Sequence, residues 1–83
     1  MSKVFVSKNI KLSLDFDNFI TQKPDILKRV PSGAWIIFTK KGDNTFNKQS
    51  RQLGLKVKKN QRKRVVEARK EGSAWILELL NAK

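Results

Sequence analysis

Hydrophobic and polar positions near the N-terminus recur with the period of an α-helix. Over residues 4–21, one apolar line repeats at spacings of seven, four and three residues and consists of Phe5, Leu12, Phe16 and Phe19. A second line consists of Val6, Ile10 and Leu14. Two lines make a broad apolar surface, so we expect this helix to contact two partners, the core of its own chain and a second copy. We assign the homodimer contact to the first line.

Two short segments follow this helix. Residues 24–29 begin with a proline and hold two apolar residues, which suits one short helical turn lying over the core. Residues 34–39 form a run of β-branched and aromatic residues between turn signals, which predicts a buried strand. We therefore expect Trp35 in the core, and Trp75 in a similar run likewise.

The segment from Asn44 to Lys70 contains no proline and predicts one long helix. Its apolar face consists of Phe46, Leu53, Val57, Val65 and Ala68. Asp43 or Asn44 is the expected N-cap, and Gly72 ends the helix. Gly54 lies within this segment, where it indicates either a close contact between helix and sheet or a kink.

The tail, residues 73–80, fits either a helix capped by Ser73 or a strand. We favour the strand, because residues 72–77 nearly repeat the sequence of residues 32–37. Two such strands joined by a helix form a parallel β-α-β unit. The predicted fold class is therefore α/β, in a single domain over residues 1–83. It has an N-terminal helix, a short helical turn, then a β-α-β unit with a small parallel sheet and one long basic helix.

A sheet of only two strands is marginally stable and exposes unpaired backbone groups at both edges. Either the first helix and the short turn cover these edges, or two chains join. The second possibility agrees with the two apolar lines of the first helix, so we expect a homodimer.

Positive charge is concentrated in the middle of the chain. Lysine and arginine total 19 against 7 acidic residues, a formal net charge of +12, and residues 48–70 carry +9 of it with Glu67 as their one acid. On the predicted helix these cations lie opposite the apolar face, as contact with phosphates requires. We expect DNA or RNA to bind at Arg51, Lys58, Lys59, Arg62, Lys63 and Lys70.

The excess of lysine over arginine qualifies this expectation. The chain has 14 lysines and 5 arginines, and lysine lacks the bidentate fork that reads guanine, so any binding should be weakly sequence-specific. The alternative is a solvated basic face on a protein-interaction or homodimerisation module that has no nucleic-acid role.

Several chemistries lack their usual side chains. The chain has no His, Cys or Tyr, so we predict no metal site, no cofactor and no disulfide. Asp15 and Asp17 are the candidate carboxylate pair, but residues two apart on a helix do not face each other, and we expect no enzymatic activity. No apolar run is long enough for a signal peptide or a membrane span, so we expect a cytoplasmic protein.

Part of the sequence resembles a known family. Residues 9–20, followed by Lys23-Pro24-Asp25 and then residues 30–34, are similar to the opening half of a family of small prokaryotic proteins of uncharacterised function. The resemblance continues more loosely to the last strand and implies a helix, a short helical turn, then strand, helix and strand. It implies no catalytic or binding residues. Residues 56–64 depart from it, because the family pattern has a shorter and more acidic helix there. The nucleic-acid expectation therefore rests on this sequence alone.

Overall fold

The computed structural model describes residues 2–80, and its first two elements confirm the predicted ones. Helix α1 spans Lys3–Gln22, and the Ser2 side chain caps it by accepting a hydrogen bond of 3.1 Å from the Phe5 N–H. The 3-10 helix η1 spans Pro24–Arg29 and begins with its proline, whose fixed φ suits a helix start.

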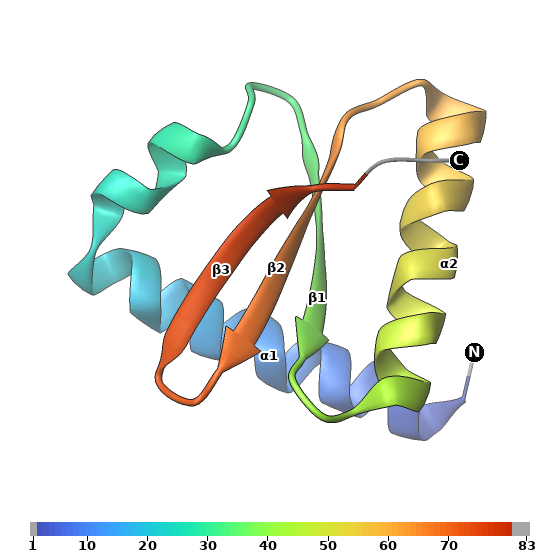
Figure 1. Ribbon diagram of the computed structural model, residues 1–83, viewed down its shortest axis with the longest axis horizontal. Coiled ribbons are helices and arrows are strands. Elements are labelled where there is room, and N and C mark those ends of the chain that lie inside the picture. Colours follow the sequence, from blue (N-terminus) through green and yellow to red (C-terminus); the bar gives the residue numbers. More distant parts are fainter. Residues whose placement is uncertain (1, 81–83) are drawn as a thin grey trace.

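The remaining elements form a strand, a helix and a two-stranded hairpin (Figure 1). They are β1 (Trp35–Lys40), α2 (Asn44–Gln61), β2 (Val65–Glu71) and β3 (Ala74–Leu79). Asp43 is the N-cap of α2, and its carboxylate accepts a hydrogen bond from the Phe46 N–H. The predicted strands at the start and the end of this region are confirmed.

The predicted helix from Asn44 to Lys70 is wrong in its second part. Helix α2 ends at Gln61, Arg62 adopts a left-handed conformation with a φ of 52°, and the chain then enters β2. Val65 and Val66 point to opposite faces of the sheet and both are buried. Burial on both faces is typical of a strand paired in parallel, and branched side chains favour it. Gly72 consequently lies in the turn between β2 and β3, not at a helix end.

The sheet is mixed, with strand order β1-β2-β3. Strand β2 pairs in parallel with β1, and β3 pairs antiparallel with β2. The prediction that the tail strand forms a parallel unit with the first strand is therefore wrong, because β2 lies between them. The β-α-β unit exists, but it runs from β1 through α2 to β2. The α/β fold class is confirmed.

Both α-helices pack against the sheet. Figure 1 shows α1 crossing behind all three strands and α2 standing beside β1. Phe16 on α1 contacts Phe38 and Trp75 edge-on, with ring centroids 5.6 and 5.1 Å apart, and Phe5 stacks on Phe46 of α2. Helix α1 therefore packs against both the sheet and α2.

The line assigned to a dimer contact belongs to this core. Phe5, Leu12 and Phe16 are buried within the single chain, and Phe19 is partly buried against the same cluster. The third strand, absent from the prediction, gives these side chains a wider sheet to cover. A contact with a second copy therefore has to use another surface of the molecule.

Gly54 marks a close approach of α2 to the sheet. A Cβ atom there would lie 2.8 Å from Cδ2 of Leu80 and 3.2 Å from two side-chain carbons of Ile37. The structure thus decides between the two predicted roles of this glycine in favour of close contact.

Candidate nucleic-acid interface

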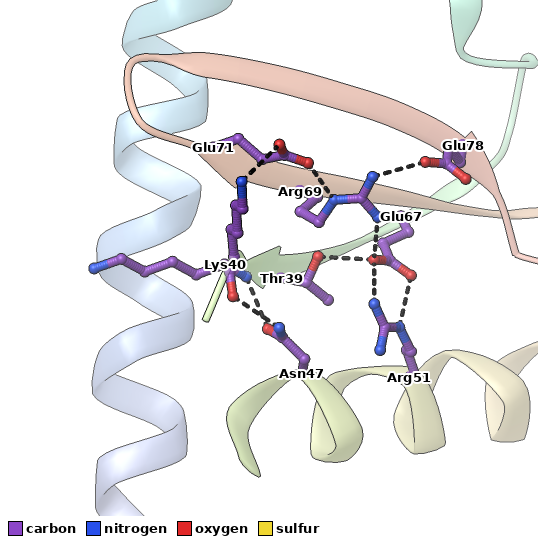
Figure 2. A network of polar contacts seen from close by, with 9 residues as sticks. Thr39, Lys40, Asn47, Arg51, Glu67, Arg69, Glu71 and Glu78 are labelled. Carbon is purple, nitrogen blue, oxygen red and sulfur yellow. Dashed lines mark hydrogen bonds and ion pairs between the residues drawn. The ribbon is translucent and has the colours of Figure 1, made fainter. Parts of the chain in front are cut away.

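A buried carboxylate organises the polar side chains between α2 and the sheet (Figure 2). Both Glu67 oxygens accept hydrogen bonds of 2.9 Å from Arg51 on α2, and one of them also accepts a bond of 2.9 Å from Thr39 on β1. The Arg51 hydrogen bonds, with the Thr39 bond, lower the pKa of Glu67 from its ordinary 4.5, although burial acts in the opposite direction. Glu67 is therefore held as an anion.

Further acid–base pairs engage other cations of the middle segment. Arg69 pairs with Glu71 at 2.7 Å, with Glu78 at 2.9 Å and with Glu67 at 3.5 Å (Figure 2). Lys70 pairs with Asp15 of α1 at 2.6 Å, and this bond lowers the pKa of the aspartate. These cations already have carboxylate partners within the chain.

Six other cations occur on the last turns of α2 and in the loop that leads into β2. We call them the basic cluster, and they are Lys56, Lys58, Lys59, Arg62, Lys63 and Arg64. Within the described residues none of them forms an ion pair. Lys58 donates a hydrogen bond of 2.8 Å to the carbonyl oxygen of Leu80, and the other five are exposed. Cations are favourable at this end of a helix, where the macrodipole is negative.

Four of the six predicted binding residues lie at this end of α2 and in the loop after it. Lys58, Lys59, Arg62 and Lys63 belong to the basic cluster. Arg51 is instead held by Glu67, and Lys70 lies on β2 with Asp15 as its partner.

Lys56 and Arg64 are cluster members that the sequence prediction missed. The predicted helix from Asn44 to Lys70 includes Arg64, but α2 ends three residues before it and leaves Arg64 in the exposed loop. A count of charge along the chain, without a helical wheel, would have included both residues.

Trp35 lies next to the basic cluster and is not a core residue. The backbone N–H of Trp35 donates a hydrogen bond of 2.9 Å to the backbone carbonyl oxygen of Arg64, so the start of β1 adjoins the loop after α2. The residue is 44% exposed, whereas Trp75 is buried as predicted. Trp35 is the first residue of β1, at the end of the strand that adjoins the exposed loop after α2. An aromatic surface beside cations is suited to stacking with a base.

Two kinds of feature are absent from the described part of the chain. Residues 2–80 contain no group of three or more acidic side chains placed to hold a metal ion. No helix among them is both long enough and apolar enough to span a bilayer.

Comparison with known proteins gives a family but no function. No curated protein and no solved structure matches this chain. One family model matches residues 4–80, from the start of α1 through the end of the hairpin, and agrees with the resemblance seen in the sequence. The chain therefore belongs to the family of unknown function DUF5647.

Proposed function

We propose that this protein binds nucleic acid through the basic cluster, by contact with the phosphate backbone and with little sequence preference. The observation that carries the proposal is the group of six cations within residues 56–64 that have no acidic partner among the described residues. Arg51, Arg69 and Lys70, by contrast, are neutralised within the chain. The charge that remains open to a polyanion is thus concentrated at one end of α2.

The composition of the cluster and the neighbouring Trp35 support a particular class of ligand. Four of its six members are lysines, which act as point charges, so they neutralise phosphates and release counterions without reading base edges. Trp35 beside them offers a face for an unpaired base, which favours single strands over duplex.

Fluorescence anisotropy with labelled duplex DNA and single-stranded RNA tests the proposal. We expect binding that weakens steeply with salt, with a slope of log K against log salt of about −4 to −5 if roughly five phosphates of a duplex are contacted. The triple variant Lys59→Glu, Arg62→Glu, Lys63→Glu should lower the magnitude of that slope by about three.

A matched control separates the basic cluster from net charge. The triple variant Lys23→Glu, Lys28→Glu, Arg29→Glu changes the charge by the same amount around η1, far from α2 in Figure 1. It should keep the salt slope of the original protein. Absence of binding at low salt, or equal losses in both triple variants, would refute a role of the basic cluster.

A further inference from the structure

The outward side of α1 carries the second apolar line, which the core does not use. Val6 is 43% exposed, Ile10 is 53% exposed and Leu14 is 58% exposed. These side chains recur every four residues, so they form one stripe along the helix. Figure 1 shows α1 behind the sheet, and the burial of Phe5 and Leu12 places the stripe on the side turned away from the strands.

Two opposite charges stand at the ends of this stripe. Lys3 lies seven residues before Ile10 and Asp17 lies seven residues after it, so all three share nearly one line of the helix. Neither charged residue forms an ion pair with another described residue. The stripe is therefore symmetric about Ile10 in its apolar residues and opposite in charge at its two ends.

This pattern is self-complementary, as the interface of a two-fold symmetric homodimer requires. If a second α1 lies antiparallel with the two-fold axis at Ile10, then Ile10 meets the partner's Ile10, and Val6 meets the partner's Leu14. Lys3 then meets the partner's Asp17, and the same contact occurs twice. A parallel copy would instead place Lys3 against Lys3 and Asp17 against Asp17.

We propose that the protein forms a homodimer through antiparallel α1 helices in this register, a surface separate from the basic cluster. The contact extends over about 21 Å of helix at 1.5 Å per residue, which is small, so we expect a dissociation constant in the micromolar range. The +12 charge of each chain opposes association, so the measurement belongs at physiological ionic strength, where the Debye length is about 8 Å.

Sedimentation equilibrium of the full chain over a wide concentration range tests the dimer. Ile10→Asp places two carboxylates against each other on the axis and should give a monomer. Val4→Asp is the matched control, because Val4 is equally aliphatic and 64% exposed on α1 but lies off the stripe. It should leave the dimer intact. Circular dichroism verifies that both variants fold.

Charge exchange tests the register. Lys3→Asp alone and Asp17→Lys alone each turn two opposite-charge contacts into like-charge ones and should weaken the dimer by about tenfold. The double variant restores opposite charges and should recover most of that loss.

Three results would overturn the proposal. They are a wild-type chain that stays monomeric at high concentration, a dimer insensitive to Ile10→Asp, and a double variant as weak as the single ones. Vesicle binding by a monomeric wild-type chain would assign the stripe to a membrane surface instead.

Discussion

Glu67 makes the stability of the fold depend on pH. Its pKa is lower in the folded protein than in the unfolded chain, chiefly because Arg51 donates two hydrogen bonds to the carboxylate. A carboxyl group with a lowered pKa contributes stability above its unfolded pKa, here near 4.5. That contribution is lost as the pH falls through the folded pKa. The pH window of interest therefore lies below about 4.5.

Replacement of Glu67 by glutamine should reproduce the effect of acid at neutral pH. We expect Glu67→Gln to lower the free energy of unfolding by about 1.5–3 kcal/mol at pH 7, the range for hydrogen bonds to charged groups, and by much less near pH 3. Urea unfolding at both pH values measures the difference. Glu78→Gln is the control, since Glu78 is more exposed and its loss should cost about 0.5 kcal/mol or less. An equal loss from Glu67→Gln at both pH values would contradict the linkage.

Trp35 provides an optical signal for nucleic-acid binding. Because it is half-exposed beside the basic cluster and Trp75 is buried, single-stranded RNA should quench the emission of Trp35 and leave that of Trp75 unchanged. Titration of the original protein and of Trp35→Phe measures this. Quenching of equal size in the variant would show that the bases do not contact Trp35.

The sequence predicts the helices and strands that are bounded by proline, by turn residues or by a capping residue. Pro24 and the turn residues around Gly33 bound η1 and β1, and period and capping identify α1. No glycine or proline separates α2 from β2, and Val65 and Ala68 fit a helical face as well as a strand. Only pairing with β1 distinguishes the two states, and local sequence carries no information about that pairing.

The contact of α2 with the sheet limits the size of residue 54. We expect Gly54→Val to destabilise the protein by about 1–3 kcal/mol, because its side chain would overlap Ile37 and Leu80. Gly54→Ala should change stability by less than about 1 kcal/mol, since a gain in helix propensity offsets a milder overlap. Gln52→Val, at an exposed position of the same helix, is the control for both in thermal unfolding. If Gly54→Val proved as stable as that control, α2 could not approach Ile37 and Leu80 as closely as the structure shows.

At the scale of the whole molecule, the sequence shows where positive charge is concentrated but not which of these cations lack an acidic partner in the fold. The excess over residues 48–70 is real, yet Arg51 and Lys70 are neutralised by acids distant in sequence. The two apolar lines of α1 are likewise visible in the sequence, but which line faces the core is decided by contacts of Phe5 and Phe16 with aromatic side chains of α2, β1 and β3. Both errors have one cause, since contacts between distant segments decide which side chains stay exposed.

The position of α1 in the chain also has a consequence for the order of folding. The hairpin of β2 and β3 closes through two residues and can form within microseconds, whereas β1 joins β2 only after residues 41–64 close a long loop. Helix α1 is synthesised first, but its partner Trp75 lies on the last strand. Phe38 of β1 and Phe46 of α2 are made earlier, so a nascent chain can cover part of the apolar side of α1 before β3 exists, but the side of Phe16 that contacts Trp75 stays uncovered until β3 has been made. This is the interval in which chaperones or premature aggregation compete with folding.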